Sequence, residues 1–141
     1  MDEVVRREII LDNYQHPMHK GLVEDDSYIK KNTNNDSCID NIDMMMKIKD
    51  GVIEDIVFDG EACSICTSAT SILIRTLIGK TKEEAEVVLE NYQNMIHEIE
   101  YDKEILGELN VYDQVYKQPN RKTCALLPSK AAESILKESE K

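Results

Sequence analysis

The stretch IDMMMKIKDGVIEDIVF, residues 42–58, decides the fold of this chain. It contains two apolar-rich runs, 42–49 and 52–58, with Asp50-Gly51 between them. Both positions of an Asp-Gly pair tolerate positive φ, which is typical of a tight turn that joins antiparallel strands. The stretch therefore predicts a β-hairpin whose second strand is closed by Asp59-Gly60.

The chain before the hairpin begins with a helical pattern. Residues 3–15 separate apolar from charged positions with a helical period. His16-Pro17 ends this helix, because the residue before a proline avoids the α region. Residues 18–41 then predict a short extended stretch followed by a polar loop, with Cys38 at the end of that loop.

Helical patterns also dominate after the hairpin. Residues 64–78 predict a helix whose first half is rich in small side chains, with Gly79 as its C-terminal cap. Thr81 and Glu84 form a capping box, which opens a further helix. Residues 101–117 are expected to be helical in part, with apolar anchors at Leu106, Leu109 and Val115.

Two prolines organise the C-terminal part of the predicted chain. Pro119 is expected to break the chain before Arg121–Cys124, and a last helix is expected to begin at about Pro128, a residue that suits the first helical position. The order of helix, hairpin and helices predicts one α+β domain over residues 1–141. In it, helices pack on a small antiparallel sheet of about three strands.

Composition limits the classes of function. The chain has 141 residues and a net charge of −11, from 28 acidic and 17 basic residues. This charge repels phosphate backbones and anionic lipid, so we expect no binding to nucleic acid or membrane. It favours a protein partner with a basic docking surface. We see no signal-peptide pattern and no apolar run of about 20 residues, so we expect a cytoplasmic protein.

Three cysteines stand at the ends of predicted elements. Cys38 closes the polar loop, Cys63 lies where a strand gives way to a helix, and Cys124 precedes the last predicted helix. Asp40 is two residues beyond Cys38, so in an extended segment both side chains point the same way. Three thiolates and one carboxylate would complete a tetrahedral zinc shell, and the same ligands also suit iron or an iron–sulfur cluster.

Other interpretations of these residues remain open. The cysteines could be scattered apolar side chains of the core, because the sequence has no paired Cys-x-x-Cys elements of a zinc ribbon. Cys63 and Cys66 could form a dithiol redox motif, although we favour Cys66 as a filler of a small-residue slot. The three histidines are expected to lie at the surface or in helix caps rather than to bind metal: His16, His19 and His97.

At these residues the chain resembles the U-type scaffold family of iron–sulfur cluster assembly, which includes IscU, the NifU N-terminal domain and SufU. The resemblance covers nearly the whole chain. It runs through Ile9–Tyr14, His16-Pro17 to Gly21, Cys38-Ile39-Asp40, Phe58–Ser71, Val115 to Pro119 and Arg121–Leu127. Cys63 and Cys124 are 61 positions apart, and Thr123 stands where IscU has a histidine; both features resemble the SufU branch.

The resemblance implies an IscU/SufU-like fold and a metal site formed by Cys38, Asp40, Cys63 and Cys124, with Arg121 supporting it. It also implies that Cys38 accepts persulfide sulfur from a SufS-like cysteine desulfurase and that downstream iron–sulfur assembly or acceptor proteins receive it. The chain departs from the family pattern where Ile39 and Ala62 replace glycines and Cys66 replaces a serine.

Three functions follow as expectations. The first is a zinc-dependent sulfur acceptor, a sulfurtransferase-like accessory protein rather than a stand-alone enzyme. The second is a scaffold on which a [2Fe–2S] cluster is assembled and transferred, so that iron or the cluster replaces zinc. The third is a metal-stabilised interaction module without sulfur chemistry.

Overall fold

The computed structural model describes residues 2–17, 19–32 and 41–139. Its sheet has three antiparallel strands in the order β1 (Tyr28–Asn32), β2 (Asn41–Lys49) and β3 (Val52–Glu61). The β2–β3 hairpin, which turns at Asp50 and Gly51 with positive φ at both, confirms the prediction. The extended stretch predicted within 18–41 includes the edge strand β1.

Strand β3 is longer than predicted. Asp59-Gly60 does not close it, because Gly60 pairs with Ile42 and Glu61 pairs with Asn41. Gly60 has φ +136°, and a Cβ at this position would collide with the carbonyl oxygen of Asn41. The glycine therefore lets the two backbones approach closely at the end of the ladder, where a side chain would force them apart.

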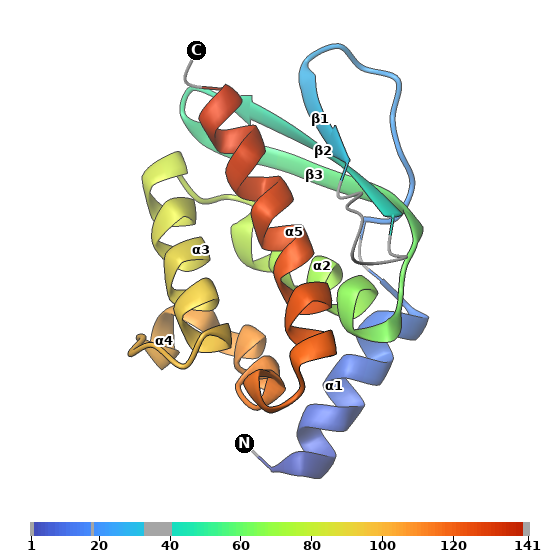
Figure 1. The fold of residues 1–141 in the computed structure, drawn as a ribbon. Coiled ribbons are helices and arrows are strands. Elements are labelled where there is room, and N and C mark those ends of the chain that lie inside the picture. Colours follow the sequence, from blue (N-terminus) through green and yellow to red (C-terminus); the bar gives the residue numbers. More distant parts are fainter. Residues whose placement is uncertain (1, 18, 33–40, 140–141) are drawn as a thin grey trace.

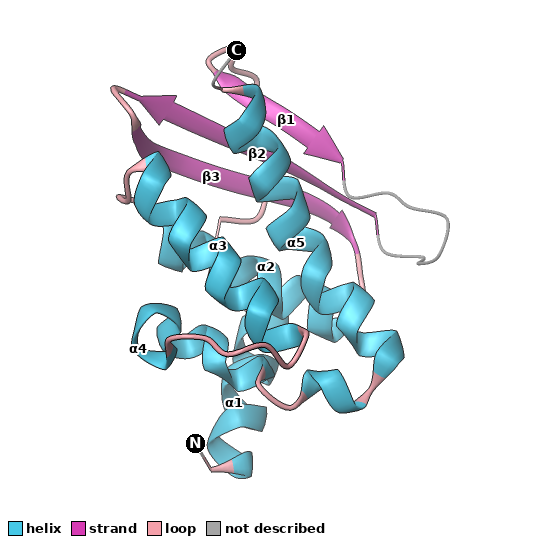
Figure 2. Cartoon of the chain, turned by 60° about the vertical axis from the view of Figure 1, so that its left-hand side comes forward, coloured by secondary structure: helices cyan, strands magenta, loops and turns pink. Residues whose placement is uncertain are grey.

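The helices cover one face of the sheet, as Figures 1 and 2 show. They are α1 (Glu3–Gln15), α2 (Ser64–Leu77), α3 (Lys82–Ile96), α4 (Lys103–Leu106) and α5 (Pro119–Glu138), with the 3₁₀ turns η1 (Gly107–Tyr112) and η2 (Val115–Lys117). The capping box of Thr81 and Glu84 is present at the start of α3. The predicted anchors Leu106, Leu109 and Val115 are buried.

The core lies between the sheet and α2, α3 and α5. Inward-facing side chains of β2 and β3, among them Ile42, Met44 and Phe58, are 0–1% exposed. Helix α2 contacts α1 and α5 and lies against β3, so it occupies the centre of the molecule. Its first half is built of small residues, as predicted, and this lets neighbouring backbones approach it closely.

The prediction for the last helix was wrong. Helix α5 begins at Pro119 and includes Pro128, so Pro119 opens the helix and Cys124 lies inside it. Pro119 occupies a first-turn position, where its missing N–H costs nothing.

A proline inside a helix costs about 3 kcal/mol, because it removes one backbone hydrogen bond of the helix. Side-chain hydroxyls bond two carbonyl oxygens of the turn before Pro128. The Tyr92 hydroxyl donates to the Ala125 carbonyl oxygen at 2.7 Å, and the Ser129 hydroxyl donates to the Leu126 carbonyl oxygen at 2.7 Å. The apolar side chains on both sides of Pro128 stay buried, and the free energy of this burial favours a continuous helix. Across the described residues, no helix has the length and apolar character that a membrane span requires.

Substitution of the two hairpin glycines separates backbone strain from steric conflict. Gly51 has φ +77°, and a methyl group there would meet no atom within 4 Å, so Gly51→Ala should lower the free energy of unfolding by only about 1–2 kcal/mol. Gly60→Ala adds a clash with the backbone of β2, so we expect a loss of about 3 kcal/mol or more. Urea denaturation of both variants checks this, and equal losses would show that β2 moves aside without cost.

Candidate functional site

Cys63 caps the first turn of α2. Strand β3 ends at Glu61, and Cys63 then adopts an extended conformation as the N-cap residue. Its Sγ accepts a hydrogen bond from the backbone N–H of Cys66 at 3.5 Å. The thiol thus takes the place of the oxygen that normally caps a helix, and it is held at the positive end of the helix dipole. Its side chain is partly exposed.

Cys124 and Arg121 lie on the first turns of α5. Cys124 is partly exposed and packs against the hydrophobic core, whereas Arg121, almost one turn earlier, is exposed. Helix α5 packs against α2, the helix that Cys63 caps. The structure therefore places the predicted ligands Cys63 and Cys124 on two helices that contact each other, at the N-cap of α2 and within α5.

Cys38 and Asp40 lie outside the described residues. The nearest described residue is Asn41, which pairs with Glu61, two residues before Cys63. Among residues 2–17, 19–32 and 41–139, no group of three His, Cys, Asp or Glu side chains is placed to hold a metal ion. The four-ligand set of Cys38, Asp40, Cys63 and Cys124 therefore stays a prediction.

Cys66 lies in the core. Its side chain is 0% exposed, and it belongs to the same buried cluster as Ile65 and Ala69. This position agrees with the interpretation of Cys66 as a filler of a small-residue slot. Of the two thiols of the Cys-x-x-Cys pair, only that of Cys63 is partly exposed.

Two buried tyrosines stand beside this part of α2. The Tyr112 hydroxyl and the Ser68 hydroxyl are 2.5 Å apart, and the rings of Tyr92 and Tyr112 meet edge to face with centroids 6.4 Å apart. Burial raises the pKa of both phenols, so both stay neutral and keep their hydrogen bonds. Through Ser68 and the Ala125 carbonyl oxygen, they link α2 and α5 on the core side of the cysteines.

The histidines occupy the positions expected for them. His16 and His97 follow the last turns of α1 and α3 as C-cap residues. His19 lies beside the sheet, where its Nδ1 is 3.4 Å from Asp55 Oδ1.

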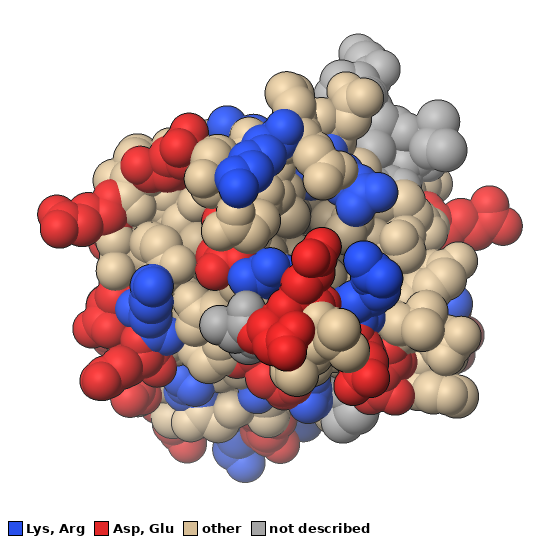
Figure 3. Space-filling model, turned by 90° about the horizontal axis from the view of Figure 1, so that it is seen from below, with Lys and Arg blue, Asp and Glu red and all other residues tan. Residues whose placement is uncertain are grey.

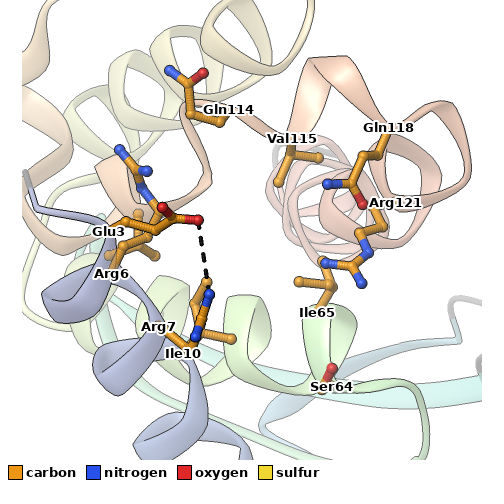
Figure 4. A pocket seen from close by; sticks show the side chains of 11 residues that line it. Glu3, Arg6, Arg7, Ile10, Ser64, Ile65, Gln114, Val115, Gln118 and Arg121 are labelled. Atoms are coloured by element: carbon orange, nitrogen blue, oxygen red, sulfur yellow. Dashed lines mark ion pairs between the residues drawn. The ribbon is translucent and has the colours of Figure 1, made fainter.

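A pocket of about 380 Å³ opens beside the N-terminus of α2 (Figure 4). Residues from α1 form one side, the segment from η1 to α5 forms the other, and the start of α2 lies between them. The lining residues are Glu3, Arg6, Arg7, Ile10, Ser64, Ile65, Val111, Gln114, Val115, Gln118 and Arg121. Figure 3, seen from below, shows that acidic and basic side chains are intermixed on this end of the molecule.

Sequence reasoning missed the pocket and the part that Arg6 and Arg7 play in it. These residues lie more than fifty positions before Ser64, and only the packing of α1 against α2 brings them together. A possible signal was the rarity of arginine: the chain has four arginines, and two of them are adjacent in the first helix.

Comparison with known proteins supports the resemblance stated above. The family model of the NifU-like N-terminal domain matches residues 5–125. The zinc-dependent sulfurtransferase SufU of Bacillus subtilis is 34% identical over 132 residues, which cover 93% of this chain and 88% of the relative. The iron–sulfur cluster assembly scaffold protein IscU of Streptococcus pyogenes is 32% identical over 133 residues, which cover 93% and 82%.

A solved structure agrees with these relatives. The SufU crystal structure from Fervidobacterium islandicum superposes with a TM-score of 0.86 at 32% identity, covering 92% of this chain and 94% of that chain. The predicted α+β fold, with its three-stranded sheet and helices on one face, is confirmed. On the family match and the two relatives above 30% identity, the chain belongs to the NifU-like N-terminal domain family.

Proposed function

We propose that this protein acts in iron–sulfur cluster assembly as a zinc-dependent acceptor of persulfide sulfur from a cysteine desulfurase. The observation that carries the proposal is the register of β2 and β3. It sets Asn41 opposite Glu61; Asp40 directly precedes Asn41 in the sequence, and Cys63 follows Glu61 by two residues. The relative from Bacillus subtilis, named a zinc-dependent sulfurtransferase, supports the same activity.

We assign Cys38, Asp40, Cys63 and Cys124 as the metal ligands. The pairing of Asn41 with Glu61, two residues before Cys63, supports Asp40 as a ligand, because Asp40 directly precedes Asn41 in the sequence. The contact between α2 and α5 supports Cys124 as the third thiol. Sulfur and carboxylate ligands in a four-coordinate shell are the set that zinc prefers, so the residues fit this metal.

Bound zinc would keep its cysteine ligands ionised. We assign sulfur uptake to Cys38, in accord with the family resemblance. The Cys38 thiolate attacks the outer sulfur of the desulfurase persulfide, a new S–S bond forms on Cys38, and the desulfurase cysteine leaves as a thiolate. The exchange needs no oxidant or reductant. Arg121, almost one turn before Cys124, would stabilise negative charge that gathers at the site.

The second candidate is a scaffold for a [2Fe–2S] cluster, which the Streptococcus pyogenes relative named IscU favours. The same three thiols could hold iron in place of zinc. In either case we place the protein in the cytoplasm, working between a SufS-like desulfurase and downstream acceptor proteins.

Metal content separates the two candidates. Protein purified anaerobically should contain about one zinc per chain and no labile sulfide, because three thiolates and one carboxylate fill the shell. Elemental analysis and a sulfide assay measure both. Substitution of any one ligand, for example Cys124→Ala, should lower zinc occupancy. A stoichiometric content of iron and sulfide in the resting protein would instead favour the scaffold.

Sulfur uptake tests the role of Cys38. After incubation with the desulfurase and L-cysteine, intact-mass spectrometry should detect one added sulfur on the wild type and none on Cys38→Ser. Cys66→Ser is the matched control: because Cys66 is buried in the core, this variant should lose stability but still accept sulfur.

The rate of the desulfurase in the presence of each variant separates sulfur acceptance by Cys38 from a role as an interaction module. Full stimulation by Cys38→Ser would support the interaction module without sulfur chemistry. Loss of sulfur uptake in Cys66→Ser, with the fold intact by circular dichroism, would instead favour a redox mechanism that uses the Cys63 and Cys66 thiols.

A further inference from the structure

Three of the four arginines in this acidic chain line one pocket, the pocket between α1, α2 and α5 in Figure 4. Arg6 and Arg7 come from α1, and Arg121 comes from the first turn of α5. Arginine presents a planar fork of donors that matches carboxylate oxygens, whereas lysine acts as a point charge. In a chain of net charge −11, three arginines around one pocket concentrate positive charge there.

The charges in the pocket are only partly compensated. Arg6 pairs with Asp113 at 2.9 Å, and Arg7 makes a looser pair with Glu3 at 3.8 Å (dashed in Figure 4). Arg121 makes no ion pair with any residue that the structure describes. Three arginines against two acids leave the surroundings of the pocket with a net positive charge, which favours an anionic ligand.

The rest of the lining suits a small organic ligand. Ile10, Ile65 and Val115 provide apolar surface, and Gln114 and Gln118 provide amides at the side formed by η2 and α5. Ser64 is the first residue of α2, where backbone N–H groups and the positive end of the helix dipole add to the attraction for an anion. An apolar surface with a few convergent polar groups is typical of small-molecule sites.

We propose that this pocket binds the carboxylate of a small organic thiol, and that this thiol collects the sulfur that the protein has accepted. The second half of the inference rests on the proposed function. The pocket begins at Ser64, the residue after Cys63, and Arg121 precedes Cys124 by three residues, so its lining adjoins in the chain two of the residues that we assign to the metal site.

The sulfur transfer balances without a further reactant. The thiolate of the small molecule attacks the outer sulfur of the protein persulfide, and a new S–S bond forms on the small molecule. The S–S bond of the protein breaks, and the protein cysteine leaves as a thiolate. The sulfur departs as a small-molecule persulfide that carries its own carboxylate.

Binding is tested with butyrate, a carboxylate of the right size without a thiol. Titration of the ¹⁵N-labelled, zinc-loaded protein should shift the amide signals of Ser64 and the signals of Arg121, and butyramide, which lacks the charge, should not. Arg121→Gln should abolish the shifts. Shifts that are absent, or that occur away from the pocket, would overturn the inference.

Sulfur release is tested with two thiols that differ in the carboxylate. Protein loaded with persulfide by the desulfurase is treated with 3-mercaptopropionate or 2-mercaptoethanol, and each rate is divided by the rate of the same thiol with a small-molecule persulfide. The wild type should reach half-maximal rate at a concentration of 3-mercaptopropionate about tenfold lower than of 2-mercaptoethanol, the effect of one charge-assisted hydrogen bond.

Variants assign that preference to the pocket. Arg121→Gln should remove the preference for 3-mercaptopropionate. Glu3→Gln should strengthen this preference several-fold, because Arg7 loses its competing partner. Arg75→Gln, which removes a positive charge away from the pocket, should retain the preference. Equal half-maximal concentrations for both thiols in the wild type would overturn the inference and leave the proposed function standing. If the desulfurase deposits no sulfur on the wild type, the proposed function is wrong, and so is the proposed sulfur transfer from the protein to the small thiol.

Discussion

Helix α2 is buried on all sides over residues 65–74, and the rest of the fold is arranged around it. Such burial is possible because its polar side chains are small and have hydrogen-bond partners, both within the helix and on neighbouring elements. The Thr70 hydroxyl donates to the Cys66 carbonyl oxygen at 2.7 Å, and the Ser71 hydroxyl donates to Asn13 Oδ1 of α1 at 2.8 Å. A buried hydroxyl without a partner costs about 1–3 kcal/mol, so these bonds are a condition for placing a helix of this composition in the core.

This central helix also explains where the candidate site lies. Its N-terminus emerges from the core at Cys63, so the capping thiol is fixed to the most deeply packed element while its side chain stays partly exposed. The buried hydroxyls of Tyr92 and Tyr112 fasten α5 and η1 to the same core. A rigid element that ends at the surface in a partly exposed thiol is an effective way to position a metal ligand, because packing rather than loop conformation determines its place.

Local signals in the sequence predicted most of this architecture. The hairpin depends on Asp50-Gly51 and the start of α3 on Thr81 and Glu84, and each signal lies within a few residues of the feature it determines. The start of α5 could not be predicted in the same way. The helix continues through Pro128 among buried residues, and the hydroxyl of Tyr92, 36 positions earlier, bonds the Ala125 carbonyl oxygen just before it; no local rule contains this tertiary packing.

The candidate site shows the same division. Cys63 at the N-terminus of a helix followed from the sequence, and so did the core position of Cys66 as the favoured interpretation. The arginine pocket did not, because it needs residues from α1, α2 and α5 that meet only through tertiary packing. As metal ligands, Cys38 and Asp40 remain predictions, because they lie outside the residues that the structure describes.

The arginine cluster has a kinetic consequence in a chain of this charge. At physiological ionic strength the Debye length is about 8 Å, so the positive potential of the pocket fades within a few water layers. Beyond that distance an approaching anion meets the field of a protein with net charge −11. Salt should therefore accelerate the encounter by weakening the outer repulsion, while it weakens the final contact, and the two opposed effects make association and residence respond to ionic strength in opposite directions.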